Sequence, residues 1–305
     1  MRSLIESLGS LSLLLVAVAS YGCGGAQPPA DPAHSSHGIN RVAAARGDGA
    51  NPEAPSSQLG IPVAEGAILE QHLEAKREAE MERPGAKERE HARTGARART
   101  DALVETLPPA TRRGLAALEE ALVAEINELR RDPAGYRDAL THFGAMYQGD
   151  ILVVPGYPSV RTKEGKVAVD DALAMLEWAP AAPALTRSPG LTEAARGHAA
   201  YLHDTNTLGH GGHDGAAPHD RMDLYGRVQG LYAENIAALY RDAELMILDL
   251  LVDDGVETRV HRFNLLGETF TTVGVGCAPH PAHEVVCVID FAEIYTDESS
   301  SVTER

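Results

Sequence analysis

Apolar residues recur every three or four positions in several segments of the chain, which is the pattern of helices with one buried face. The first such segment follows Pro108-Pro109, ends near Pro133, and carries Leu115, Leu118, Leu122, Ile126 and Leu129. The same spacing predicts helices over 165–177, 188–202 and 243–251. Ser188-Pro189 marks the start of the third of these, because Ser caps a first helical turn and Pro fits its first position.

Shorter apolar runs predict strands over 151–154, 271–277 and 285–292. The last run alternates Val286, Val288 and Asp290 with Cys287, Ile289 and Phe291, which is typical of a half-buried antiparallel strand. Helices and strands mix without a regular βαβ repeat, so the pattern predicts an α+β fold.

The first 23 residues are typical of an export signal, with Arg2 as the basic part and an apolar run over 11–19 that is too short for a membrane span. Two cleavage sites are open. Ser20-Tyr21-Gly22-Cys23 is similar to a lipobox, which would make Cys23 an acylated residue, whereas Ala17-Val18-Ala19 is an ordinary small-residue site. We favour the lipoprotein, because the segment after Cys23 is rich in small residues and Pro, as a tether would be.

The segment over 24–113 is predicted to connect this signal to a folded domain. Residues 24–62 lack apolar periodicity, which predicts disorder. Residues 65–107 alternate acidic and basic side chains without a sustained heptad pattern, so we expect a solvated, partly helical spacer rather than a coiled coil. The domain is expected over 114–295, followed by a disordered tail over 296–305.

Charge narrows the range of partners. The chain has 44 acidic residues against 27 Lys and Arg, a net charge of −17, and residues 114–305 hold 30 of the acidic residues against 14 basic ones. Such an acidic domain repels phosphate backbones and anionic lipid headgroups, and no basic patch offsets it. We therefore exclude nucleic acid as a partner and expect contact with a membrane only through a lipid anchor.

Histidine is the residue type that suggests chemistry. Five of the thirteen His lie between 198 and 219, and imidazole is a good ligand for zinc-like ions. However, the sequence contains no H-E-x-x-H motif, nucleophile elbow, Walker loop, dinucleotide fingerprint or C-x-x-C pair. The sequence therefore lacks the motifs of the enzyme classes that are most easily recognised.

A series of short segments in one order is more specific. It consists of Gly209-His210-Gly211-Gly212, Asp214 to Arg221, Ala233-Glu234-Asn235-Ile236-Ala237, Asp253 to Leu265 with the string His261-Arg262-Phe263-Asn264-Leu265, and Val273-Gly274-Val275-Gly276. This series resembles the CAP superfamily, also called the cysteine-rich secretory, antigen 5 and pathogenesis-related family, in its bacterial-type, SCP-like branch. The resemblance covers about residues 114–295.

The resemblance implies a three-layer α-β-α sandwich with a cleft where two His and two acidic residues converge, and where several family members bind a divalent metal. Carried over by motif, the residues are His210, Glu234 and His261, with Asp253 as the second acid and Asp254 as its alternative. The usual Trp of the second acid's motif is missing here. The resemblance therefore implies a metal site, most readily for zinc, formed by His210, His261, Glu234 and Asp253.

Four neighbouring residues have other expected roles. His213 is either a fifth ligand or a residue of the rim, and Val260 replaces the Gly that usually precedes the second His. Arg221 and Arg259 are expected to pair with nearby carboxylates rather than contact a substrate.

The cysteines predict a disulfide bond. If Cys23 is acylated, Cys277 and Cys287 remain, symmetrically placed on the two strands of an expected hairpin in an oxidising compartment. Directly opposed residues on antiparallel strands meet the short separation of a disulfide, so we expect this bridge.

Three functions remain open. The first is a binding module that holds a divalent metal and presents its cleft to a small molecule, glycan or protein. The second is a metal-dependent hydrolase, similar to a peptidase, with Glu234 or Asp253 as base. The third is a structural cell-surface protein. In each case we expect an extracytoplasmic location, either as a cell-envelope lipoprotein or as a secreted protein.

Overall fold

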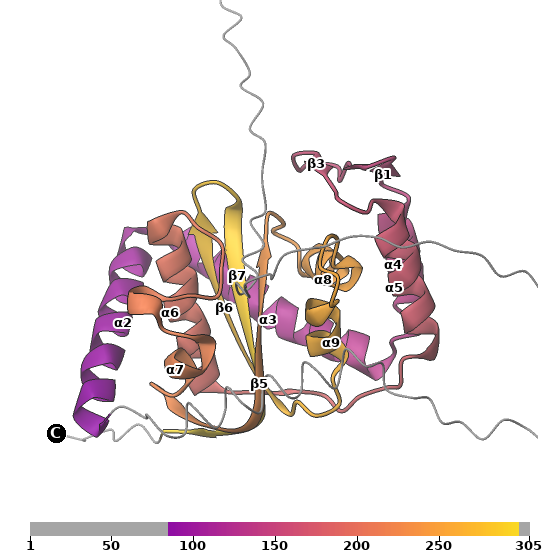
Figure 1. Ribbon diagram of the computed structural model, residues 1–305. Helices are drawn as coiled ribbons and strands as arrows, with labels where there is room; N and C mark the ends of the chain where they lie inside the picture. Colours follow the sequence, from indigo (N-terminus) through magenta and orange to yellow (C-terminus); the bar gives the residue numbers. More distant parts are fainter. Residues whose placement is uncertain (1–84, 299–305) are drawn as a thin grey trace, which may run out of the picture. The chain divides into compact units, whose positions relative to one another are not determined.

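The computed structural model describes residues 85–298 (Figure 1). The predicted export signal, Cys23, most of the tether and the end of the tail lie outside the described residues. The elements are, in chain order, α2 (Ala86–Thr106), α3 (Pro109–Arg131), α4 (Arg137–Gly144), β1 (Tyr147–Gln148), β2 (Ile151–Leu152), β3 (Val160–Arg161), α5 (Lys166–Trp178), β4 (Thr186–Arg187), α6 (Pro189–Thr205), the short 3-10 helix η1 (His213–Gly215), α7 (Pro218–Met222), β5 (Gly226–Ala238), α8 (Ala243–Val252), α9 (Val260–Leu266), β6 (Thr272–His280) and β7 (Glu284–Asp297).

The main sheet has the strand order β4-β6-β7-β5. Its short edge strand β4 runs parallel to β6, whereas β6, β7 and β5 are antiparallel to their neighbours. The three short strands β1, β2 and β3 form a separate antiparallel sheet. The other edge strand of the main sheet, β5, carries Glu234 and Asn235.

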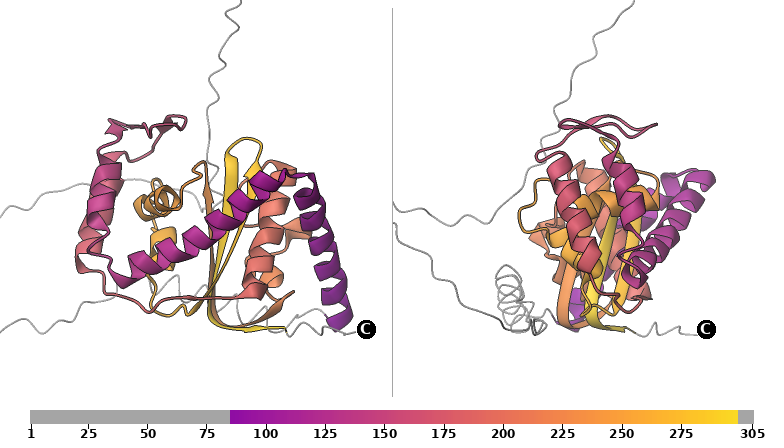
Figure 2. Two further views of the ribbon diagram at one scale, coloured as in Figure 1. Left: turned by 180° about the vertical axis from the view of Figure 1, so that it is seen from behind. Right: turned by 90° about the vertical axis from the view of Figure 1, so that its right-hand side faces the viewer.

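Helices cover both faces of the main sheet. Helix α6 packs against β6 and β7 on one face, with α2 and α7 beside it, whereas α3, α8 and α9 lie on the other face (Figures 1 and 2). Helices α4 and α5 pack on each other beyond α8. The structure is therefore the α+β, three-layer α-β-α sandwich expected from the sequence.

The predicted half-burial of the last strand is wrong. Val286, Val288 and Asp290 on one face of β7 are as buried as Cys287 and Ile289 on the other. The reason is the second helical layer. Helix α6 covers the face of β7 that carries Val286, Val288 and Asp290, whereas the acidic Asp290 had suggested that this face is exposed to solvent. Asp290 is thus a buried acid in the middle of the sheet.

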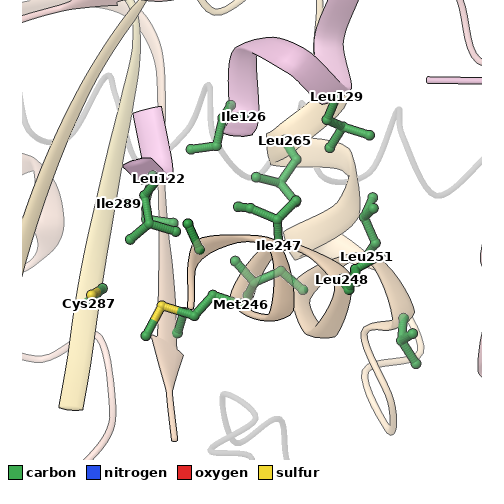
Figure 3. Close-up of a cluster of buried hydrophobic side chains, with 14 of the residues drawn as sticks. Leu122, Ile126, Leu129, Met246, Ile247, Leu248, Leu251, Leu265, Cys287 and Ile289 are labelled. Atoms are coloured by element: carbon green, nitrogen blue, oxygen red, sulfur yellow. The ribbon is translucent and has the colours of Figure 1, made fainter. Parts of the chain in front are cut away.

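The larger core lies between the sheet and α3, α8 and α9 (Figure 3). Leu122, Ile126 and Leu129 of α3 are fully buried, as the spacing predicted, and they face Ile247 of α8 and Ile289 of β7 in one cluster. Each fully buried aliphatic side chain contributes about 2 kcal/mol through the hydrophobic effect.

Two glycines bring α6 close to β6. A Cβ atom at Gly274 would lie 2.2 Å from the backbone carbonyl carbon of Leu191, and one at Gly276 would lie 2.1 Å from the backbone nitrogen of Arg196. The helix itself begins at Ser188, whose hydroxyl accepts a hydrogen bond from the Leu191 amide at 3.0 Å. The alternate glycines of the V-G-V-G segment thus let a helix backbone rest directly on a strand.

The charged segment before the predicted domain forms α2, and this helix is not fully solvated. Ala96 of α2 is buried, and its Cβ lies 4.0 Å from the position that a Cβ of Gly197 in α6 would occupy. Leu103 packs against the small apolar cluster under α6. Tertiary packing therefore begins upstream of the predicted boundary at 114.

Cys277 and Cys287 are directly opposed on β6 and β7, with their Cα atoms 4.1 Å apart, and they form the predicted disulfide. Among residues 85–298, no helix is both long and apolar enough to span a membrane.

Candidate functional site

His210 and Glu234 form the first of two histidine–carboxylate pairs. His210 lies in the loop after α6, and its Nδ1 is 2.8 Å from Oε1 of Glu234 on β5. Arg221 of α7 donates to the other oxygen, Oε2, at 2.5 Å, and also to the backbone carbonyls of His210 and Ala216. One arginine therefore holds both the carboxylate and the loop that carries the histidine.

The charge on Glu234 follows from these contacts. Burial alone would raise the pKa of this carboxyl, but the hydrogen bond from His210 and the charge of Arg221 outweigh burial and lower the pKa. Glu234 is thus an ionised carboxylate inside the protein, as a buried charge with good partners can be.

His261 and Asp253 form the second pair. Asp253 ends α8 in the left-handed conformation, with φ 54°, which Asp tolerates better than most residues. Its Oδ1 lies 2.7 Å from Nδ1 of His261, and its Oδ2 accepts from the His261 amide at 3.0 Å. Asp254 instead accepts hydrogen bonds from the amides of Lys163 and Glu164 at 2.6 and 2.7 Å. Of the two candidate acids, Asp253 is therefore the partner of His261.

Strand β5 contacts both histidine–carboxylate pairs. Glu234 and Asn235 are consecutive residues of the strand, so their side chains point to opposite sides of it. The side-chain nitrogen of Asn235, Nδ2, donates to the backbone carbonyl of His261 at 3.0 Å. The side-chain oxygen of Asn235, Oδ1, accepts from Nδ2 of Asn264 at 2.8 Å. Strand β5 thus holds the ring of His210 through Glu234 and the backbone of His261 through Asn235.

The residues fit a metal only in part. Within residues 85–298, no three His, Cys, Asp or Glu side chains converge in a way that could hold a metal ion. Nevertheless, each carboxylate takes Nδ1 of its histidine and leaves Nε2 without a hydrogen-bond partner in the described part of the chain. Carboxylates orient metal-binding imidazoles in this way. Each ring could therefore offer its Nε2 to a divalent ion, with Glu234 orienting His210 and Asp253 orienting His261.

His213, Arg221 and Arg259 have local partners. His213 pairs with the exposed Asp214 at 2.6 Å rather than with Glu234 or Asp253, which favours the rim over a fifth ligand. Arg259 binds Glu164 through two nitrogens, at 2.7 and 2.6 Å. Both arginines are carboxylate partners, as expected from the sequence.

Asp290 was not predicted to belong to the site, yet it lies directly opposite Glu234 in the β5–β7 register. It is 1% exposed, and burial, then the charge of Glu234 and a hydrogen bond to it, raise the pKa of Asp290 well above the ordinary value. When it is protonated, the Asp290 carboxyl can donate to the Glu234 carboxylate, and this contact favours the protonated form. The sequence signal was a single acid inside the apolar run over 285–292.

His198 of α6 is the second residue that sequence reasoning missed. It is fully buried, its Nε2 lies 2.8 Å from the Gly209 carbonyl, and the same nitrogen is 3.9 Å from Oε1 of Glu234. Burial, more than the charge of Arg221, lowers the pKa of His198 to about 4. His198 is therefore neutral at physiological pH and supports the loop that carries His210.

The domain is therefore an α-β-α sandwich that carries two histidine–carboxylate pairs beside its edge strand β5. A family model described as the CAP, or cysteine-rich secretory protein, family matches residues 123–291, which is more than half of the chain. The protein belongs to this family.

Two solved structures are similar to parts of the chain. One is an extracellular protein containing a SCP domain from Bacillus anthracis str. Ames, with 26% identity and a TM-score of 0.29, over 36% of this chain and 34% of that one. The chain thus spans about a third of that protein's length. The other is an outer surface protein from Borrelia burgdorferi, with 18% identity and a TM-score of 0.32, over 36% of this chain and 78% of that one. No curated protein matches.

Proposed function

We propose that this CAP domain is an extracytoplasmic binding module whose two oriented histidines, His210 and His261, bind a divalent cation, most readily zinc. The observation that carries the proposal is the orientation of both rings by buried carboxylates, which leaves Nε2 of each available. The side chains of His210 and His261 are 51% and 22% exposed, so an ion in solution can reach them. Water or a bound small molecule, glycan or protein would complete the coordination.

Hydrolysis is a weaker alternative, because a hydrolase needs a free base. Both oxygens of Glu234 are engaged by His210 and Arg221, and both oxygens of Asp253 are engaged by the side chain and amide of His261. Neither candidate base is therefore free to take a proton from water. A purely structural role at the cell surface would need no exposed Nε2 atoms.

Isothermal titration of zinc into the full chain tests the metal site. We expect one zinc per chain, with affinity falling as the solution is acidified because protonated imidazole cannot bind metal. His210→Ala and His261→Ala should each weaken zinc binding, whereas His142→Ala, at an exposed position of α4, should not. Equal affinities in all four proteins, or no zinc binding at micromolar concentration, would refute the site.

The location and attachment of the protein are part of the proposal. The family is a secretory one, the domain contains a disulfide, and the first residues are typical of an export signal, so we place the domain outside the cytoplasm. We further propose that Cys23 is acylated, and that the segment after it tethers the domain to the cell envelope. Mass spectrometry of the native N-terminus is expected to find a lipid on Cys23; an unmodified N-terminus at Ser20 would instead indicate a secreted protein.

A further inference from the structure

His280 is the last residue of β6, at the turn that leads into β7, and it belongs to neither histidine–carboxylate pair. It is 3% exposed, and both of its ring nitrogens are engaged. The backbone amide of Ala282 lies 3.2 Å from Nδ1, and since an amide N–H only donates, Nδ1 accepts. Burial lowers the pKa of His280 and keeps the ring neutral, so the ring hydrogen is on Nε2. Nε2 therefore donates to the backbone carbonyl of Thr207, at 3.1 Å.

Thr207 begins the loop that carries His210. Its amide donates to the Leu202 carbonyl at the end of α6, at 3.3 Å, but its carbonyl belongs to the next planar peptide group, which leads to Leu208. The orientation of that peptide group sets the direction in which the chain leaves the helix. Leu208 is 40% exposed, so its side chain gives the loop little support. The hydrogen bond from His280 therefore fixes the first peptide group of the loop.

The loop has few contacts of its own. Glycines lie on both sides of His210, at Gly209 and Gly211, and glycine restricts the backbone less than any other residue. Within the described part of the chain, the backbone amides of 208–211 donate no hydrogen bond. The position of His210 therefore depends on what holds the carbonyl groups of the loop.

Side chains from three elements hold these carbonyl groups. Nε2 of His198, on α6, lies 2.8 Å from the carbonyl oxygen of Gly209. Arg221 of α7 donates to the carbonyl oxygen of His210, also at 2.8 Å. His280 of β6 supplies the contact at the start of the loop. The loop is thus positioned from outside, by residues that are distant from one another in the sequence.

We propose that His280 is a positioning residue for the metal site, because its Nε2 holds the Thr207 carbonyl and so keeps His210 where it can bind zinc. This role rests on the proposed function, in which His210 is a zinc ligand. Without the contact the loop samples more conformations, and zinc binding has to restrict them again. Losing one hydrogen bond should therefore weaken zinc binding by about three- to tenfold.

Two substitutions of His280 separate this role from the support of the turn. In His280→Asn, the side-chain oxygen takes the place of Nδ1 and accepts from Ala282, but no donor reaches Thr207. In His280→Gln, the side-chain nitrogen takes the place of Nε2 and donates to Thr207, whereas the acceptor for Ala282 is lost. Neither variant should release the turn from α6, because Nδ1 of His203 also bonds to the Pro279 carbonyl, at 2.8 Å.

Isothermal titration of zinc into the full chain gives the first measurement. His280→Asn should bind zinc about three- to tenfold more weakly than the wild type, and His280→Gln should bind within about twofold of it. Each variant loses one hydrogen bond, so urea unfolding should show comparable losses of stability in the two. His283→Asn is the control and should keep wild-type affinity, because the native His283 ring packs on that of His280, with centroids 4.9 Å apart, and holds no loop carbonyl.

Two outcomes of this titration would overturn the proposal. One is equal zinc affinity in His280→Asn and the wild type. The other is an equal loss of affinity in His280→Asn and His280→Gln, which would mean that His280 acts through the turn or contacts the ion itself.

The tautomer of His210 provides a second measurement that needs no metal. Nδ1 of His210 lies 2.8 Å from the Glu234 carboxylate, which only accepts, so Nδ1 carries the hydrogen of the neutral ring. The imidazole nitrogen resonances of the metal-free protein should show this tautomer in the wild type and in His280→Gln, and a smaller share of it in His280→Asn. If the wild type binds no zinc, the metal site fails, and the tautomer still tests the positioning. Identical His210 resonances in His280→Asn and the wild type would refute it.

Discussion

Replacing Asp290 by Asn should make the stability of the protein less dependent on pH. The Asp290 carboxyl is buried in the sheet, opposite Glu234, and its pKa is raised well above the ordinary value by burial and by the Glu234 charge. The folded protein therefore keeps this proton to a higher pH than the unfolded chain does. An Asn side chain has almost the same shape and donates to Glu234 from its amide without needing a proton.

The sign and the size follow from proton linkage. Below the ordinary Asp pKa, near 4, both the folded and the unfolded state hold the proton, so Asp290 contributes no pH dependence. Above it, the unfolded state releases the proton first, and the wild type loses about 1.4 kcal/mol of stability per pH unit until the folded carboxyl ionises as well. Asp290→Asn lacks this loss, so its advantage over the wild type should grow as the pH rises from 4.

Glu234 makes the stability of the protein depend on pH at lower pH than Asp290 does. Its pKa is lowered in the folded state, because His210 and Arg221 outweigh the effect of burial, so the stability that it contributes is present above the ordinary Glu pKa and is lost on acidification below it. The comparison of wild type with Asp290→Asn above pH 4.5 therefore isolates Asp290.

Urea unfolding at pH 4.5, 5.5, 6.5 and 7.5 provides the measurement. Helical circular dichroism is the better probe, because the single Trp of the chain, Trp178, is 80% exposed and reports little on the core. Asp204→Asn, at an exposed position near the end of α6, serves as the control and should follow the wild type. The reasoning fails if wild type and Asp290→Asn give parallel profiles over this range.

Three further predictions concern the disulfide, the α6 contact and the metal site. Replacing Cys277 and Cys287 together by Ala should lower the free energy of unfolding by about 2–3 kcal/mol, because the unfolded chain loses a closed loop; equal urea midpoints in both proteins would contradict this. Gly276→Ala should cost about 1–3 kcal/mol in the same assay, because its Cβ would meet the backbone of α6, whereas Gly211→Ala, with no atom within 4 Å, should cost little. Glu234→Gln should weaken zinc binding by about tenfold to a hundredfold in calorimetry while keeping the fold; unchanged affinity would show that the carboxylate does not orient His210.

Local sequence determined the elements and much of the site. The apolar spacing of Leu122, Ile126 and Leu129 predicted α3, and Ser188 predicted the start of α6, because helix periodicity and capping depend on nearby residues. The positions of Cys277 and Cys287 predicted their pairing, because a hairpin aligns residues symmetrically about its turn. The family motifs then indicated which histidines and acids belong together.

Tertiary structure decided what depends on distant segments. Asp253 and Asp254 are neighbours in sequence, and only the left-handed end of α8 directs the first to His261 and the second to the amides before α5. The burial of Asp290 required α6 to cover β7, and its position beside Glu234 required the β5–β7 register. The burial of Ala96 required a charged helix, α2, to pack on α6. Each of these contacts joins residues far apart in the chain, and their formation depends on the packing of whole layers, which no local pattern of apolar and polar residues encodes.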